Sequence, residues 1–134
     1  GSGPQGDHLR ANLPANVRMV SGISDAALRW SYAMSRGLIA PSFEDFGLAP
    51  LEAGAFGKPC LALRAGGYLD TVHEGLSGSF FDLPTPDAIR HGVLHGQATP
   101  WNPEAIRAHA ERFSEARFIQ RIRAEVSKLL GRSL

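Results

Sequence analysis

Two glutamates eight residues apart are the side chains best suited to chemistry in this chain. Glu44 and Glu52 bracket a glycine turn within the run Glu-Asp-Phe-Gly-Leu-Ala-Pro-Leu-Glu. A short apolar stretch at residues 37–40 precedes them, and a segment rich in alanine and glycine follows. This order is typical of a strand, a loop and the start of a helix, which is where parallel α/β sheets bind ligands. Because ionised carboxylates accept hydrogen bonds from neighbouring hydroxyls, the pattern indicates a polyhydroxylated, anionic ligand such as a nucleotide sugar.

The helix expected after this turn adds an anion site. Pro50 suits the first helical position, which makes Ala49 the N-cap and places Glu52 third in the helix. Alanine has no side-chain acceptor, so we expect the N–H groups from Gly47 to Leu51 to lack a local partner. Such N–H groups and the helix dipole favour an anion, and phosphate is the natural occupant. In the alternative interpretation of Glu52, its charge only complements the helix dipole.

Strands that alternate with helices predict the fold class, an α/β Rossmann-like parallel sheet flanked by helices. We expect strands at residues 17–22, 38–40, 60–63 and 79–82. We expect helices at residues 24–36, 50–57, 88–96, 102–113 and 114–130. The small residues 53–55 indicate that their helix packs closely against the sheet. Residues 1–134 are expected to form a single, partial domain, with its final helices at about residues 102–130.

A double glycine, Gly66-Gly67, follows the strand expected at residues 60–63. Glycine lets the backbone approach a ligand closely, so this pair is predicted to lie beside the ligand. The alternative is a plain tight turn. Arg64 is either a cation for a phosphate or a strand-end side chain that points to solvent, and we expect the second.

Composition excludes several classes of function. The chain has 134 residues and a net charge of +1, which favours one domain with a core and argues against a nucleic-acid partner. Cys60 is the only cysteine and lies in an apolar run, which indicates a buried, inert thiol. His91 and His95 have helical spacing, but no carboxylate or cysteine accompanies them, so no metal site is expected. No apolar run approaches about 18 residues and no signal-peptide pattern appears, so we expect a cytoplasmic protein.

The first six residues, Gly-Ser-Gly-Pro-Gln-Gly, have the literal spacing of a dinucleotide-binding motif. That motif must follow a strand, and here Pro4 also falls inside the turn. A nicotinamide-dependent oxidoreductase is therefore the weaker alternative. Whether Gly1-Ser2 is native or a cloning remnant stays open.

From Val17 to Leu130, the chain resembles the C-terminal, donor-binding domain of the GT-B glycosyltransferases, in particular the retaining family 4, or group 1. The resemblance rests on the family's E-x7-E motif, commonly written E-G-F-G-L-x-x-L-E-A, which Glu44 and Glu52 match. Further matches are Gly57-Lys58-Pro59-Cys60, Gly66-Gly67 and Gly78-x-Phe80-Phe81.

The resemblance implies a role for each motif residue. Glu44 would be the catalytic-site carboxylate that binds hydroxyls of the donor sugar, and Glu52 would bind the ribose hydroxyls of the nucleotide. The backbone N–H groups of Phe46, Gly47 and Leu48 would contact the sugar and the distal phosphate.

Other donor-binding residues are implied by position. The loop at Gly22 would lie near the base, and Gly66 and Gly67 would line the donor site. Ser42 either touches the sugar or only ends its strand.

The implied reaction transfers a glycosyl unit from a nucleotide diphosphate sugar with retention of configuration. The resemblance implies no metal cofactor, because protein cations and the helix dipole take its place, and the chain has no Asp-x-Asp motif. Asp45 stands where the family commonly has glycine. This variant is similar to that of some bacterial mannosyltransferases and favours GDP-mannose as the donor.

The chain also departs from the family pattern. The family's diphosphate-binding Arg and Lys lie upstream, so the chain is expected to be truncated at its N-terminus and to lack the acceptor-binding N-terminal domain. We expect the isolated chain to be inactive and its exposed sheet edge to favour self-association. Peripheral membrane association of the full enzyme stays open. The alternative function is a non-catalytic module of the same fold that binds nucleotide sugars or proteins.

Overall fold

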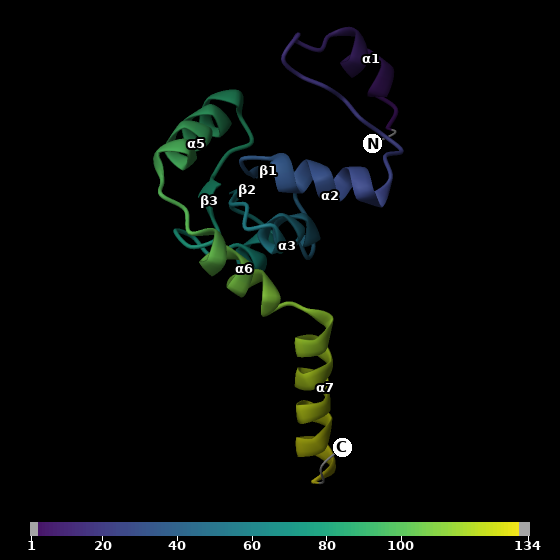
Figure 1. Ribbon diagram of the computed structural model, residues 1–134, viewed down its shortest axis with the longest axis vertical. Helices are drawn as coiled ribbons and strands as arrows, with labels where there is room; N and C mark the ends of the chain where they lie inside the picture. The colour runs from purple at the N-terminus through teal and green to yellow at the C-terminus, as the bar shows by residue number, and fades with distance from the viewer. Residues whose placement is uncertain (1–2, 132–134) are drawn as a thin grey trace. The chain divides into compact units, whose positions relative to one another are not determined.

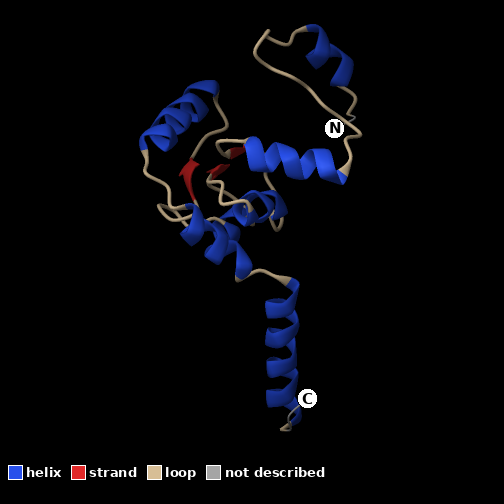
Figure 2. Ribbon diagram, viewed as in Figure 1, coloured by secondary structure: helices blue, strands red, loops and turns tan. Residues whose placement is uncertain are grey.

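A computed structural model of the chain describes residues 3–131. The chain divides into two compact units, and the boundary falls between Ser31 and Tyr32. We describe each unit by itself. Figures 1 and 2 show the helices and strands of both units.

The first unit contains helix α1 (Gly6–Ala11) and most of helix α2 (Asp25–Met34). The Ser24 hydroxyl oxygen accepts a hydrogen bond from the Ala27 N–H at 3.2 Å, which confirms the predicted start of α2. Gly22 has a φ of 62°, so the chain turns in the left-handed region just before this cap.

The strand predicted at residues 17–22 is wrong, because these residues adopt no regular secondary structure. The N–H of Val17 donates to the carbonyl oxygen of Pro14 at 2.9 Å, within a local turn. A strand depends on hydrogen bonds to a neighbouring strand, and an alternating pattern of side chains does not supply that neighbour.

The second unit is built on a parallel sheet of order β1-β2-β3. The strands are β1 (Leu38–Ala40), β2 (Cys60–Leu63) and β3 (Gly78–Phe81). Leu38 pairs with Cys60, which in turn pairs with Gly78. These strands lie within one residue of the predicted positions.

Within residues 3–131, five helices connect or follow the strands. Helix α3 (Leu48–Ala55) joins β1 to β2, and the short α4 (Tyr68–Thr71) joins β2 to β3. The last three are α5 (Pro86–Ala98), α6 (Pro103–Glu111) and α7 (Glu115–Leu130).

Side-chain caps explain where α5 and α6 begin. The Thr85 hydroxyl accepts from the N–H of Ala88 at 3.3 Å, so α5 starts two residues before the predicted Ala88. Asn102 caps α6, because its carboxamide oxygen accepts hydrogen bonds from the N–H groups of Glu104 and Ala105 at 2.9 and 3.2 Å.

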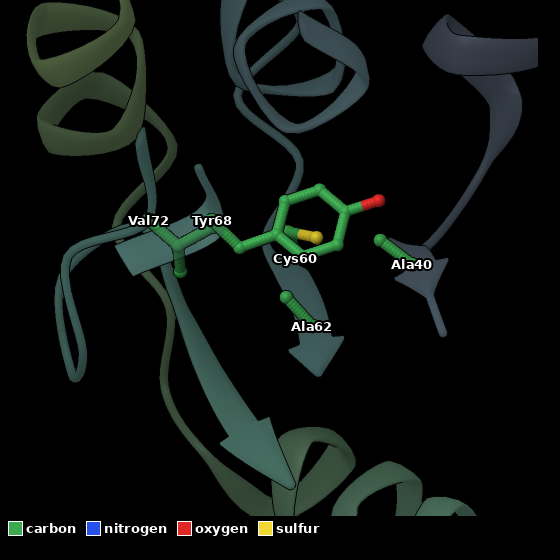
Figure 3. Packing of buried hydrophobic residues seen from close by; sticks show 5 residues of the cluster. All are labelled: Ala40, Cys60, Ala62, Tyr68 and Val72. Atoms are coloured by element: carbon green, nitrogen blue, oxygen red, sulfur yellow. The ribbon is translucent and has the colours of Figure 1, made fainter. Parts of the chain in front are cut away.

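The core lies between the sheet and the helices that follow β1 and β2. Figure 3 shows its buried cluster, in which the ring of Tyr68 lies by Cys60 and the Tyr68 hydroxyl points toward Ala40. Cys60 is 2% exposed, and burial raises the pKa of its thiol to about 12, which confirms the predicted buried cysteine. On the opposite face, α5 approaches Leu61 at Gly92, where an added Cβ would lie 2.7 Å from a Leu61 methyl carbon.

Helix α3 packs against α6 as well as against the sheet. A Cβ on Gly54 would lie 3.1 Å from the Cβ of Ala110, and Ile106 beside it is fully buried. The small residues predicted to face the sheet therefore include one, Gly54, that faces a helix instead.

Helix α7 forms where predicted, after the N-cap Ser114. Five of its large apolar side chains are exposed, from 39% at Ile119 to 86% at Leu129, whereas Val126 is half-buried. Within the described part of the chain, no helix combines the length and the apolar character needed to cross a membrane.

Candidate functional site

The loops that follow β1 and β2 meet through their backbones at the carboxyl edge of the sheet. The N–H of Gly67 donates to the carbonyl oxygen of Glu44 at 2.8 Å. A Cβ on Gly67 would collide with backbone atoms of Phe46, and one on Gly66 would collide with the Glu44 carbonyl. Gly66 also has a φ of 55°. The double glycine therefore holds the loop that carries Glu44 in place.

This close approach refines the interpretation of the double glycine. The sequence predicted that Gly66 and Gly67 let backbone approach a ligand. In the structure, the backbone that they approach is the Glu44 loop itself. A role for the two glycines in binding the donor stays a proposal.

A chain of polar groups connects Glu44 to the core. The Ser42 hydroxyl donates to Oε1 of Glu44 at 3.0 Å, and its oxygen lies 3.2 Å from the hydroxyl oxygen of Tyr68. Tyr68 is 2% exposed, whereas Glu44 is exposed. Ser42 thus has a position that neither sequence interpretation anticipated, because it orients the carboxylate.

Helix α3 begins earlier than predicted. Its N-cap is Gly47, with a φ of 82°, and not Ala49. Leu48 is the first helical residue, so Pro50 is third and Glu52 fifth. The left-handed glycine makes this start available, and proline is still tolerated because N–H groups of the first turn have no partner within the helix.

Among the described residues, no side chain caps α3 at Gly47, the position that takes the place of the expected Ala49. Gly47 itself is buried, and a Cβ there would lie 2.7 Å from the Tyr68 ring. The neighbouring side chains of Phe46 and Leu48 are 54% and 61% exposed. The start of α3 therefore presents backbone donors beside an accessible surface.

Glu52 has a hydrogen-bonding partner of its own. Its Oε2 accepts a hydrogen bond from the hydroxyl of Tyr32, at 2.8 Å. The Tyr32 ring stacks on Phe56, with ring centroids 5.8 Å apart and planes inclined by 20°. Burial, together with the hydrogen bond to the negative Glu52, raises the pKa of Tyr32 to about 12. The Tyr32 hydroxyl therefore stays protonated and donates throughout the neutral range.

Sequence reasoning missed Tyr32 as the partner of Glu52 and Tyr68 as the partner of Ser42. In the sequence, Tyr32 stands among the apolar residues of its helix, and Tyr68 directly follows the double glycine. The one available signal was a hydroxyl on an otherwise apolar, part-buried side chain, which needs a hydrogen-bonding partner.

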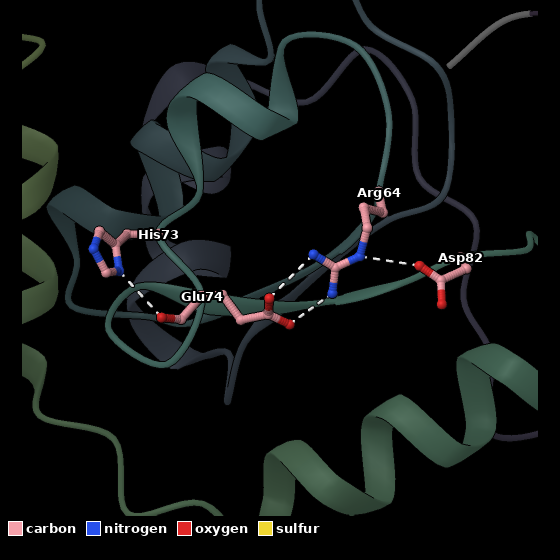
Figure 4. A network of polar contacts seen from close by, with 4 residues as sticks. All are labelled: Arg64, His73, Glu74 and Asp82. Carbon is pink, nitrogen blue, oxygen red and sulfur yellow. Dashed lines mark hydrogen bonds and ion pairs between the residues drawn. The ribbon is translucent and has the colours of Figure 1, made fainter.

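Arg64 is exposed just after β2, as expected, and its guanidinium is also engaged by two carboxylates. Its guanidinium pairs with Glu74 at 2.8 Å and with Asp82 at 3.0 Å, as Figure 4 shows. It also lies 4.6 Å from the ring centroid of Phe80. The Arg64 charge lowers the pKa of Glu74 through a hydrogen bond and direct attraction. These contacts tie the end of β2 to β3, which weakens the case for Arg64 as a phosphate ligand.

The remaining candidates lie elsewhere. Gly22 belongs to the first unit and is described there. A cavity of about 410 Å³ lies at the amino ends of the strands, beside Leu38, Cys60 and Trp101, and none of the predicted site residues lines it. Within residues 3–131, no group of three or more His, Cys, Asp or Glu side chains could hold a metal ion.

Comparison with known families identifies the class of protein that this fold and motif represent. Residues 7–112 match the family described as "Glycosyl transferases group 1". The chain belongs to this family.

The chain is also similar to individual members of known enzyme groups. It is 35% identical over 82 residues to a glycogen synthase of Thermus thermophilus, which covers 60% of this chain and 19% of that protein. It is 26% identical over 132 residues to a glycogen synthase of Pseudomonas fluorescens, which covers 94% of this chain and 27% of that protein. The chain thus spans about a fifth to a quarter of the length of these relatives.

A solved structure supports the fold. Sucrose-phosphate synthase from Thermosynechococcus elongatus superimposes with a TM-score of 0.68 at 25% identity, over 94% of this chain and 33% of that one. This likeness confirms the predicted fold class, an α/β parallel sheet flanked by helices as in the GT-B glycosyltransferases.

Proposed function

We propose that this chain forms the donor-binding part of a retaining family 4 glycosyltransferase, and that it binds a nucleotide diphosphate sugar at the carboxyl edge of its sheet. One observation carries the proposal. In a group 1 glycosyltransferase chain, two exposed glutamates stand on either side of a helix start that has no side-chain cap.

The two glutamates have separate tasks in this proposal. Glu44, held by Ser42, accepts hydrogen bonds from sugar hydroxyls, and Glu52 accepts them from the vicinal ribose hydroxyls. Each carboxylate has about four lone-pair sites, so the bonds from Ser42 and Tyr32 leave acceptor capacity on both.

In this proposal, the start of α3 binds the diphosphate. The N–H groups of Phe46, Gly47 and Leu48 lie at or just before the amino end of the helix, where the dipole favours negative charge. During transfer the bond from the anomeric carbon to the diphosphate oxygen breaks, and negative charge grows on the leaving diphosphate. Fixed N–H donors stabilise that charge without having to reorganise.

The base and the sugar of the donor are to be determined by the titration described in the next paragraph. The relatives reported above carry the names glycogen synthase and sucrose-phosphate synthase, so GDP-mannose has no support from them. We propose that binding needs no metal ion, as the family resemblance implies. We also propose that the 134-residue chain binds donor without turnover, since it spans only part of the length of its relatives.

Calorimetric titration with UDP, ADP, GDP and their glucose and mannose conjugates tests the donor site. We expect one nucleotide series to bind and to keep its affinity in EDTA. Glu52→Ala should weaken that binding by roughly 10- to 100-fold, which corresponds to losing one or two hydrogen bonds to a charged group. Asp87→Ala removes an exposed carboxylate from the first turn of α5 and is the matched control. No binding to any nucleotide would overturn the donor-site proposal and favour a protein-interaction module.

A further inference from the structure

We propose that Tyr32 is a positioning residue that orients the Glu52 carboxylate toward the ribose of the donor, an inference that rests on the proposed function. The hydrogen bond from the Tyr32 hydroxyl to Oε2 of Glu52, at 2.8 Å, joins residues that are 20 positions apart in the sequence. Tyr32 would act through Glu52, without contact to the reacting atoms.

Tyr32 is itself held at three points. Its ring stacks on Phe56, the C-cap of α3, which lies four residues after Glu52 in the sequence. Its hydroxyl is hydrogen-bonded to Glu52, and its carbonyl oxygen accepts a hydrogen bond from the Ser35 hydroxyl at 2.9 Å. Because a tyrosine side chain has only two rotatable bonds, these contacts fix the position of the hydroxyl.

Glu52 needs such a partner if it is to bind ribose. Its side chain is exposed and has three rotatable bonds, so in isolation it would sample many rotamers. Fixing Oε2 selects the rotamers in which the carboxylate lies against Tyr32, and leaves Oε1 to meet a hydroxyl pair. A supporting contact of this kind raises affinity by reducing the ordering that binding requires.

The competing interpretation is that this hydrogen bond only links Tyr32 to α3 within the second unit. Glu52 is exposed and Tyr32 is part-buried, so a purely structural link would contribute little to the free energy of unfolding. The two interpretations predict different effects when the Tyr32 hydroxyl is removed. A positioning residue changes the contribution of the ribose hydroxyls, whereas a structural link changes stability without discriminating between ribose and its analogues.

The experiment compares each nucleoside diphosphate of the panel (UDP, ADP, GDP) with its 2′,3′-dideoxy analogue, by calorimetry on the 134-residue chain. The dissociation constant of the dideoxy analogue, divided by that of the parent nucleotide, measures how much the ribose hydroxyls contribute to binding. Tyr32→Phe keeps the ring and its stacking on Phe56 and removes only the hydroxyl. We expect it to reduce the ratio by roughly two- to tenfold, the size of one hydrogen bond.

Two further variants serve as references for Tyr32→Phe. Glu52→Ala should reduce the ratio further, because it removes the proposed ribose ligand itself. Ser31→Ala is the matched control, since it removes a hydroxyl from the adjacent residue whose hydrogen bond, to the Ala27 carbonyl, stays within α2. The control should leave the ratio unchanged.

An unchanged or increased ratio in Tyr32→Phe, in a chain where Glu52→Ala lowers it, would overturn the positioning role and leave the donor site standing. Failure of the unsubstituted chain to bind any of the nucleotides would overturn the proposed function instead.

A second measurement does not depend on how well Tyr32→Phe folds. An NMR titration at high pH, with the tyrosine rings labelled with carbon-13, follows the ionisation of Tyr32 separately from that of Tyr68. Glu52→Gln should lower the pKa of Tyr32 from about 12, because it removes the negative charge beside the phenol. An unchanged titration would show that the contact to Glu52 does not form, and would overturn the inference.

Discussion

Replacing Gly67 by alanine should displace the loop that carries Glu44. Gly67 has a φ of −64° and a ψ of −12°, which alanine adopts without strain, so the effect of the new methyl group is purely steric. That methyl would lie under 3.0 Å from backbone atoms of Phe46, closer than real Cβ atoms come to other atoms. A flexible side chain could move away, but here the backbone must shift.

The expected cost follows from this geometry. Overpacking at a site that cannot relax costs about 1–3 kcal/mol, and we expect Gly67→Ala to lie in the upper half of that range. The shift also strains the hydrogen bond from the Gly67 N–H to the Glu44 carbonyl. Because Glu44 and the start of α3 move with the loop, affinity for a nucleotide sugar should fall together with stability.

Urea unfolding and calorimetry check this prediction. Gly96→Ala is the matched control, because an added Cβ there meets nothing within 4 Å and the residue lies inside α5. The control should be neutral or stabilising by about 0.5–1 kcal/mol. If Gly67→Ala matched the unsubstituted chain in both stability and nucleotide affinity, the view that the double glycine positions the Glu44 loop would be refuted.

Three further predictions concern the core and the edge of the sheet. Ile106→Ala should lower the free energy of unfolding, measured in urea, by about 2–5 kcal/mol, because Ile106 is fully buried. Leu129→Ala, at an 86% exposed position, should change it by under about 0.5 kcal/mol. The ion pair between Arg64 and Glu74 lowers the pKa of Glu74 below its ordinary 4.5, so its contribution to stability is present above that pH and is lost as pH falls through the lowered pKa. When the melting temperature is plotted against pH, Arg64→Met should make its fall at acidic pH less steep. An unaltered fall would contradict the pairing. The thiol of Cys60, with its pKa raised to about 12, should resist a disulfide reagent at pH 8 until urea unfolds the chain; rapid labelling in buffer would contradict its burial.

The strands at residues 38–40 and 60–63 could be predicted to the residue from the sequence. Each is a short apolar run next to Gly37 or Pro59, and both pair with other strands of the same sheet. The segment at residues 17–22 has an alternating pattern but pairs with no strand among the described residues, because a side-chain pattern is a property of the segment and pairing is a property of its surroundings.

The start of α3 shows why helix boundaries are difficult to predict. Pro50 favours the first helical position, yet the structure uses the left-handed conformation of Gly47 to begin the helix earlier. A glycine in the sequence shows that this conformation is possible there, but the sequence alone does not show at which glycine the fold requires it.

The two glutamates of the site were predictable from their spacing and local context, but the two tyrosines that support the site were not. Tyr32 and Tyr68 reach Glu52 and Ser42 over 20 and 26 residues of sequence. Such contacts depend on how helices pack on the sheet, which no local pattern encodes. The double glycine was recognised as a close approach, and only the structure identifies its partner as the loop at residues 44–46.

A backbone-amide NMR titration with the nucleoside diphosphates UDP, ADP and GDP tests the central claim most directly. The account predicts that the best ligand produces its largest shifts at the amides of Phe46, Gly47 and Leu48, and that Glu52→Ala weakens the response. Shifts concentrated instead around the cavity beside Trp101, or no response to any of the three nucleotides, would contradict the proposal that this edge of the sheet is the donor site.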